Sequence, residues 1–314
     1  MKISRASIGL VLIFISYIVL LWWGDRKYRV FHDLAPFFQL VPLVAAVSLV
    51  TYAIRFTRWH NLLRWAGYTM PLHRGFLAYL SGFAFTATPG KVGELARIRY
   101  LQPLGVKAKD VISVFILERT LDIVVVLLLS LMVAMNGSMF GLAFAFVACF
   151  VGIVAGLAIY GRALEPVSLS LTRFNMHGLA RGLDYLRHAF TGLGRWSYSQ
   201  WIISFVLGLC AWLLTALSFV IVLHGLGIAV PISRALGIYP LAMLVGAASM
   251  LPGGLGTTEA AIVAQLQLQD VPMDLALAVA VVTRLGTLWF AVLVGGFSVL
   301  MLEYRSNSRS TLDS

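Results

Sequence analysis

Long runs of apolar residues constrain this chain more than any other feature. Crossing the hydrocarbon core of a bilayer takes roughly 20 residues of helix, and six runs approach or exceed that length. They lie at about 8–23, 38–54, 111–135, 139–160, 201–223 and 275–302. Hydrophobic residues make up 60% of the 314 positions and charged residues only 12%, whereas about a quarter of a soluble domain is charged. The sequence therefore predicts an all-α, polytopic membrane protein.

Two further apolar stretches are each interrupted near the middle. The stretch 76–104 contains Pro89-Gly90, and the stretch 235–269 contains Pro252-Gly253. Proline and glycine end helices, so each stretch is divided into two halves of about 15 residues. Such halves suit a re-entrant hairpin better than a complete crossing, because broken backbone in lipid must be shielded. We predict about six transmembrane helices plus two re-entrant broken-helix hairpins. The alternative is that every half crosses the bilayer as a short helix.

Basic residues predict the orientation. The net charge of +11 would suit a nucleic-acid partner in a soluble protein, but here the basic residues flank apolar runs, so no nucleic acid is expected. Lys and Arg gather at 55–75, 91–109 and 161–200, and are missing from 136–138, 225–233 and 270–274. This pattern predicts a bacterial inner-membrane protein with both termini in the cytoplasm. Only the basic segment 26–29 contradicts this layout.

The layout also predicts an inverted repeat within a single integral membrane domain, 1–314. Repeat 1 would cover about 55–160, repeat 2 about 201–303, and a basic amphipathic linker would cover 161–200. Inverted repeats with broken helices at corresponding positions indicate a transporter's central site. The candidate residues at the breaks are Pro89, Gly90, Gly93 and Glu94 in the first, and Pro252, Gly253, Gly254, Gly256 and Glu259 in the second.

Each hairpin is followed by a span that carries an arginine. Arg284 lies near mid-bilayer, where a charge usually faces a cavity or a partner, so we expect a functional site or an ion pair with the hairpin. Arg119 has Glu118 beside it and Asp122 three residues further along the same helix. This cluster would serve as a phosphate contact, a proton relay or a salt bridge between helices.

The remaining charged candidates lie around the breaks. Exposed amides there would face an anionic headgroup, with Glu94 and Glu259 gating it or binding protons. The helix dipole alone also favours acids at these positions. Lys91, Arg97 and Arg99 would attract lipid phosphates at the cytoplasmic mouth, or would simply mark the cytoplasmic side. A separate segment, 55–68, mixes Arg and Trp in the pattern of a helix that lies in the membrane interface.

Enzymatic motifs are missing from the sequence. It has no nucleophile elbow, no HExxH, no Walker A motif and no paired metal-ligand spacing, and Cys149 and Cys210 have no CxxC partner. We therefore expect no enzymatic activity, no cofactor and no metal. A membrane-embedded lipid-modifying transferase remains the alternative from the enzyme class.

Three motifs, in this order and spacing, resemble the lysylphosphatidylglycerol synthase transmembrane (flippase-like) family. They are the segments 88–94 (TPGKVGE), 118–122 (ERTLD) and 251–261 (LPGGLGTTEAA). The resemblance covers roughly residues 10–300 and implies a membrane domain that moves or accommodates amphiphilic lipids. The best-known members also carry a soluble C-terminal aminoacyltransferase domain. This chain ends a few residues after its last span, so lysyl transfer is not expected.

The resemblance and the predicted central site together suggest a lipid flippase-like transporter. Its substrate would be an amphiphile with an anionic headgroup, such as a phospholipid or a polyprenyl-linked sugar, bound around Arg119, Arg284 and Arg97. The expected partners are membrane lipids, and a lipid-synthesis enzyme is a candidate. The alternatives are the transferase and a non-catalytic scaffold of envelope lipid assembly. The oligomeric state stays open.

Overall fold

The computed structural model describes Val19, Arg26 and residues 35–134, 140–160, 164–173, 175–193 and 196–310. The predicted first span at 8–23, most of the basic segment 26–29 and the turn at 136–138 lie outside these described residues, apart from Val19 and Arg26. Every regular element within the described ranges is a helix, which confirms the prediction of an all-α fold.

Five of the predicted spans coincide with helices. Among the described residues, four stretches are long and apolar enough to cross a membrane: Gln39–Trp65, Phe140–Tyr160, Tyr198–Gly225 and Met273–Arg305. The first three stretches lie in α2 (Ala35–Trp65), α6 (Phe140–Tyr160) and α9 (Tyr198–Gly225), and the fourth runs through α12 (Met273–Arg284) into α13 (Phe290–Ser310). The fifth predicted span coincides with α5 (Ala108–Ala134). Helix α5 is similarly long but carries three charged residues near its middle, Glu118, Arg119 and Asp122.

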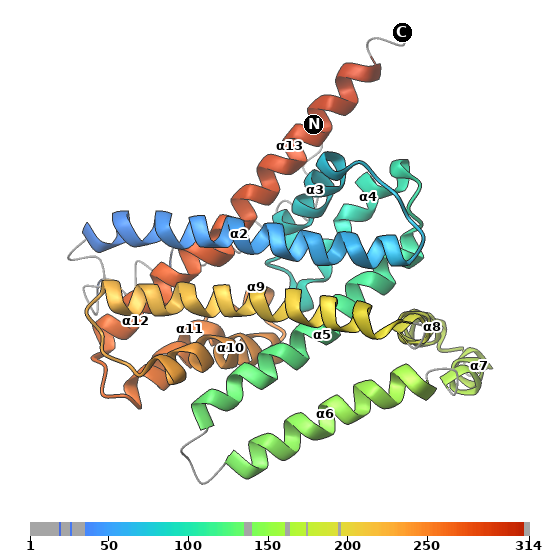
Figure 1. Ribbon diagram of the computed structural model, residues 1–314. Helices are drawn as coiled ribbons and strands as arrows, with labels where there is room; N and C mark the ends of the chain where they lie inside the picture. Colours follow the sequence, from blue (N-terminus) through green and yellow to red (C-terminus); the bar gives the residue numbers. More distant parts are fainter. Residues whose placement is uncertain are drawn as a thin grey trace.

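Helices α2 and α9 lie side by side and run in opposite directions, as Figure 1 shows. Helix α5 crosses the bundle beside them, and α6 packs outside α5. The predicted linker forms two short helices, α7 (Glu165–Arg173) and α8 (His177–Leu193). The turn Leu285–Trp289 between α12 and α13 is a π-helix, so the chain continues there without a loop.

The chain breaks at both predicted Pro-Gly positions. The first stretch consists of α3 (Leu72–Ser81), a 3-10 turn and the 3-10 helix η2 (Pro89–Arg97), followed by α4 (Ile98–Leu101). The second consists of α10 (Ile232–Ala248), η5 (Pro252–Gly254) and α11 (Thr257–Gln267). Gly90, Lys91 and Gly253 have positive φ angles of 59°, 57° and 62°. The chain reverses at these residues, and whether the pairs re-enter one membrane face stays a prediction.

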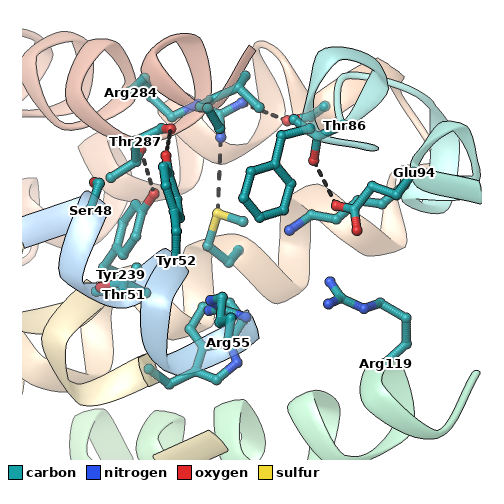
Figure 2. Close-up of a pocket in the computed structure, with 18 of the residues that line it drawn as sticks. Ser48, Thr51, Tyr52, Arg55, Thr86, Glu94, Arg119, Tyr239, Arg284 and Thr287 are labelled. Atoms are coloured by element: carbon teal, nitrogen blue, oxygen red, sulfur yellow. Dashed lines mark hydrogen bonds between the residues drawn. The ribbon is translucent and has the colours of Figure 1, made fainter. Parts of the chain in front are cut away.

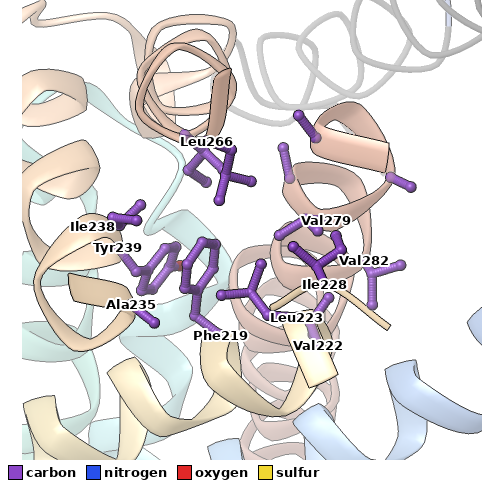
Figure 3. Packing of buried hydrophobic residues seen from close by; sticks show 14 of the residues in the cluster. Phe219, Val222, Leu223, Ile228, Ala235, Ile238, Tyr239, Leu266, Val279 and Val282 are labelled. Atoms are coloured by element: carbon purple, nitrogen blue, oxygen red, sulfur yellow. The ribbon is translucent and has the colours of Figure 1, made fainter. Parts of the chain in front are cut away.

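Each broken stretch packs in its own apolar cluster. Around α10 and α11, Phe219 stacks on Tyr239 with ring centroids 5.7 Å apart (Figure 3). Around α3, Trp59 and Tyr79 are fully buried with centroids 5.3 Å apart. Helices in lipid associate through close packing and interhelical hydrogen bonds rather than the exclusion of water. The two clusters therefore hold the broken stretches firmly on either side of the polar centre.

The prediction of an interfacial helix at 55–68 is wrong. Helix α2 continues without interruption to Trp65, and Arg58 is only 2% exposed. The segment is buried because a carboxylate on the neighbouring α5, Asp122, pairs with Arg58 at 2.9 Å. A buried partner of opposite charge makes a buried arginine tolerable.

The turns after α2 and α9 have the same geometry. It also occurs at Gly105, Asn175 and Asp270, but there no proline follows four residues later. After α2, Gly67 has a φ of 93° and Tyr68 N donates to the Leu63 carbonyl oxygen at 3.0 Å. After α9, Gly227 has a φ of 70° and Ile228 N donates to the Leu223 carbonyl oxygen at 2.9 Å. A proline four residues after each glycine then begins the next helix: Pro71 caps α3 and Pro231 caps α10. Corresponding stretches of chain thus begin with the same local structure.

Candidate functional site

The two chain breaks meet in the centre of the bundle. A methyl group added at Gly253 would lie 3.3 Å from the Cα atom of Ala87, just before the first break. Helices η2 and η5 pack against each other there. The prediction placed Pro89, Gly90 and Gly93 in one break and Pro252, Gly253, Gly254 and Gly256 in the other. The fold brings these two groups, far apart in the sequence, to one place.

A group of five charged side chains, which we call the α5 cluster, lies next to the breaks. The Arg119 guanidinium lies 3.3 Å from Glu118 and 3.2 Å from Asp122. Asp122 also pairs with Arg58 at 2.9 Å and with Arg55 at 3.3 Å. The sequence suggested the first three residues, whereas α2 supplies the two further arginines. With three arginines and two carboxylates, the α5 cluster has one excess positive charge.

Glu94 and Arg97 form a closed pair inside the first break. Their side chains lie 2.6 Å apart, and Arg97 Nε also donates to the Glu94 carbonyl oxygen at 2.8 Å. Thr86 donates to Glu94 at 2.9 Å, and the Arg97 guanidinium lies 4.6 Å from the Tyr79 ring. Arg97 is 1% exposed, so it stabilises the break from within. Arg99, two residues further along, is 73% exposed and pairs with Glu303 of α13. This exposed position suits a residue that marks one membrane face.

Arg284 ties the end of α12 to the second break. Its Nε donates to Glu259 Oε1 at 2.8 Å, and its terminal nitrogen donates to the Gly253 carbonyl oxygen at 2.5 Å. The other carboxylate oxygen of Glu259 accepts from Gly256 N at 2.8 Å, in the first turn of α11. Arg284 is 1% exposed. We expected Arg284 to form either a functional site or an ion pair with the hairpin. The geometry shows the ion pair, which joins α12 to the second broken stretch.

The breaks and the α5 cluster surround a cavity of about 110 Å³, which we call the central cavity. Figure 2 shows Arg55 and Arg119 extending into the same space from α2 and α5. Its charged lining residues are Arg55, Lys91, Glu94, Arg119 and Arg284. One water molecule needs a cavity of roughly 10–15 Å³, so the central cavity has room for several water-sized groups.

A second cavity of about 210 Å³, the side cavity, adjoins the first. Both are lined by Lys91, Arg119, Trp212 and Gly253. The side cavity continues between α5 and α10 along mostly apolar residues: Ile123, Val126, Leu244, Ala247 and Leu251. Ile123, Ala247 and Leu251 are exposed on the outside of the bundle. The two cavities together therefore form one amphipathic space, cationic inside and apolar toward the outer surface.

Three residues that line both cavities carry a donor without a partner among the described residues. Lys91 makes no ion pair with any residue that the structure describes. The indole nitrogen of Trp212 and Nε of Arg119 are buried and lack a hydrogen-bond partner within the described ranges. A buried donor without a partner is unfavourable by about 1–3 kcal/mol. An anion with several acceptor oxygens supplies the kind of partner that these donors lack. No group of three or more His, Cys, Asp or Glu suited to a metal occurs among the described residues.

Sequence reasoning missed Arg55, Arg58 and Trp212, and it left Lys91 either as a contact for lipid phosphates or as a marker of the cytoplasmic side. A signal for the first two was present, because residues three apart on a helix share a face, and here both are arginines directly after an apolar run. No comparable signal distinguishes Trp212 from the other tryptophans.

Comparison with known proteins agrees with an all-α membrane protein. A family profile described as the lysylphosphatidylglycerol synthase TM region matches residues 7–295. The curated relatives include a UPF0104 membrane protein of Methanothermobacter thermautotrophicus, 30% identical over 145 residues, which are 46% of this chain and 40% of the relative. The matched part is thus less than half the length of that relative. The chain is a multi-pass membrane protein that belongs to the lysylphosphatidylglycerol synthase transmembrane family.

Proposed function

We propose that this protein translocates an amphiphilic lipid with a phosphate-bearing headgroup across the bacterial inner membrane. The observation that carries the proposal is the amphipathic space formed by the central and side cavities. Its inner end is lined by cationic side chains, and its outer end opens through apolar residues between α5 and α10. A lipid has the same polarity pattern, with a charged headgroup joined to apolar tails.

The charges favour an anionic headgroup. The described lining of the central cavity contains four cationic side chains and one carboxylate, Glu94, which is paired with Arg97. Arg55, Arg119 and Arg284 are also paired with carboxylates, whereas Lys91 makes no ion pair with any described residue. Attraction between opposite charges is strong where water is scarce. Arginine also offers a planar fork that matches two phosphate oxygens. Arg119 and Lys91 are the best placed of these cations because both line the two cavities.

The outer end suits a hydrocarbon tail. Ile123 and Val126 of α5 face Leu244 and Ala247 of α10 across the side cavity. A lipid whose headgroup lay near Arg119 would leave its tails at this opening, where they would join the acyl chains of the bilayer. The tails would then never need to cross a polar region.

An inverted repeat belongs to the same proposal. The matching turns at Gly67 and Gly227, and the antiparallel course of α2 and α9, support repeats that cover about 35–134 and 198–310 instead of the 55–160 and 201–303 expected from the sequence. Each repeat contributes one chain break to the centre. Rocking of one such repeat against the other would expose the central cavity to each membrane face in turn.

The experiment is reconstitution of the purified protein into liposomes that contain headgroup-labelled phosphatidylglycerol. We expect labelled lipid to move between leaflets without covalent change, at a rate proportional to the amount of protein. A new lipid product would instead support the transferase, and neither movement nor product would support the scaffold. Empty liposomes and heat-denatured protein give the background rate.

A further inference from the structure

The two short helices α7 and α8 join α6 to α9 at one end of the bundle. Figure 1 shows both nearly end-on, whereas α2, α6 and α9 are seen from the side, so α7 and α8 run across the long helices. Helix α7 begins five residues after α6 ends, and α9 begins five residues after α8 ends. Because a residue spans at most about 3.6 Å, the α7–α8 pair is held within roughly 18 Å of the ends of these two spans.

Tryptophans mark the membrane boundary at this end of the bundle. The ring centroid of Trp196 lies 5.3 Å from that of Trp65 at the end of α2 and 5.3 Å from that of Trp201 in the first turn of α9. Tryptophan is enriched where lipid meets water. Near the end of α8, the buried Ala189 and Phe190 pack in one cluster with Trp196 and Trp201. The α7–α8 pair is therefore attached at the level of the membrane boundary.

One face of α8 passes from the bundle to the outside. Phe190 packs in the same cluster as Val154 and Ala158 of α6. Leu186, four residues before Phe190, and Leu179, seven residues before that, lie on the same face of α8 but are exposed. The apolar face that packs on the bundle thus continues beyond it.

The surface beside this face belongs to the lipid-facing side of α6. Helix α6 is apolar and long enough to cross a membrane, and its last two residues, Ile159 and Tyr160, are exposed. Exposed apolar residues of a span lie against acyl chains, which are as apolar as they are. Because α8 packs on α6, its exposed leucines extend the surface that faces lipid.

The α7–α8 pair also carries positive charge that the described part of the protein does not neutralise. Its two described acids, Glu165 and Asp184, both pair with Arg187, at 2.7 Å and 3.8 Å. Arg173 and Arg181 are exposed and make no ion pair with any described residue. Charges act over about 8 Å at physiological salt, close to the roughly 10 Å diameter of a helix, so both arginines attract anionic lipid beneath the pair.

We propose that the α7–α8 pair docks on the surrounding leaflet, with the apolar face of α8 inserted among the headgroups and upper acyl chains, and that it favours a leaflet rich in anionic lipids. An apolar face together with unpaired arginines is typical of helices that lie in the membrane interface. The proposal does not use the central cavity, so its test is independent of the proposed lipid translocation.

Fluorescence quenching in nanodiscs tests the position of α8. In the full chain with Cys149→Ser and Cys210→Ser, a fluorophore is attached at Gly182→Cys, and lipids carry a nitroxide quencher on the acyl chain near the headgroup. Gly182 lies three residues after Leu179 and four before Leu186, so it shares their face, and a Cβ atom added there meets nothing within 4 Å. We expect the nitroxide to quench this fluorophore strongly.

His177→Cys is the matched control, because His177 is exposed and lies five residues before Gly182, on the opposite side of α8. We expect nitroxide quenching to be at least about threefold stronger at Gly182→Cys, with the reverse order for iodide in the water. Equal quenching at the two positions would overturn the proposal. Quenching of Gly182→Cys by iodide alone would also overturn it, because the face would then be open to a soluble partner. Protection from both quenchers would do the same, because a second copy of the chain would then cover the face.

Lipid composition tests the role of charge. Nanodiscs of phosphatidylcholine alone should give weaker nitroxide quenching at Gly182→Cys than nanodiscs that also contain phosphatidylglycerol, because each arginine near an anionic surface shifts the equilibrium about fivefold toward docking. Arg173→Gln combined with Arg181→Gln should remove this difference. Arg64→Gln, which changes an exposed arginine at the end of α2, should preserve it. A difference that survives in the double variant would overturn the assignment of anionic lipid as the partner.

Discussion

The guanidinium of Arg284 donates a hydrogen bond to the carbonyl oxygen of Gly253 at 2.5 Å, across 31 residues of chain. The same side chain binds Glu259 at 2.8 Å. One residue thus joins the last long helix of the chain to the backbone of the second break and to the helix after it. Arg284 holds the break in place, whereas Arg119, which pairs with Glu118 and Asp122, lines both cavities.

Arg284→Gln should lower stability before it lowers transport. Removing one partner of a buried pair leaves the other charge unpaired, and we expect a loss on the order of 3 kcal/mol in the free energy of unfolding. Thermal unfolding in detergent measures it. The double variant Arg284→Gln with Glu259→Gln should recover part of the loss, because no unpaired charge remains. A single variant as stable as the wild type would refute this structural role.

Gly254→Ala should destabilise the protein more than Gly105→Ala. Both glycines have positive φ angles, 64° and 85°, which disfavour a side chain by about 1–2 kcal/mol. An added methyl group at Gly254 would also lie 2.6 Å from the Thr258 hydroxyl and 3.0 Å from the Gly246 Cα atom, whereas nothing lies within 4 Å at Gly105. The difference in melting temperature between the two variants measures the close packing at the second break. Equal melting temperatures would mean that the break tolerates an expanded backbone.

The sequence predicted the parts of this site that depend on local chemistry. Proline and glycine end helices wherever they occur, so the breaks at Pro89 and Pro252 were predictable. The burial of Arg58 was not, because it depends on Asp122, which lies on another helix far along the chain. The sequence also could not predict that Arg97 is buried and Arg99 exposed, because both come soon after the first break. Only the packed structure shows that Arg97 faces Tyr79.

A bulky residue at the side opening should block lipid movement. Ala247 and its neighbour Ala248 are both exposed alanines of α10. Ala247 lines the side cavity, and Ala248 is not among the described lining residues. Ala247→Trp should therefore reduce lipid movement in liposomes at least several-fold, and Ala248→Trp should leave it near the wild-type rate. If both variants move lipid normally, the tails do not pass between α5 and α10.

Cysteine labelling tests the orientation. In a background with Cys149→Ser and Cys210→Ser, a cysteine at Leu268 and another at Tyr198 place single thiols at exposed positions near opposite ends of the bundle, 81% and 90% exposed. Basic residues cluster toward the Tyr198 end, so we expect a membrane-impermeant reagent added to intact cells to label Leu268→Cys and not Tyr198→Cys. The opposite pattern would invert the layout.

The most direct test of the central claim compares lipid movement by Arg119→Gln and Arg99→Gln in liposomes. Both changes remove one arginine charge, but Arg119 lines both cavities at 20% exposure, and Arg99 lies at the surface at 73%. Asp122 keeps Arg55 and Arg58 as partners in Arg119→Gln, whereas the buried Glu118 loses its ion pair, so thermal unfolding of the same sample must first show a folded protein. A charged hydrogen bond contributes about 1.5–3 kcal/mol, so we expect Arg119→Gln to move labelled phosphatidylglycerol at least roughly tenfold more slowly, with Arg99→Gln unchanged. A folded Arg119→Gln protein that moves lipid at the wild-type rate would contradict the account.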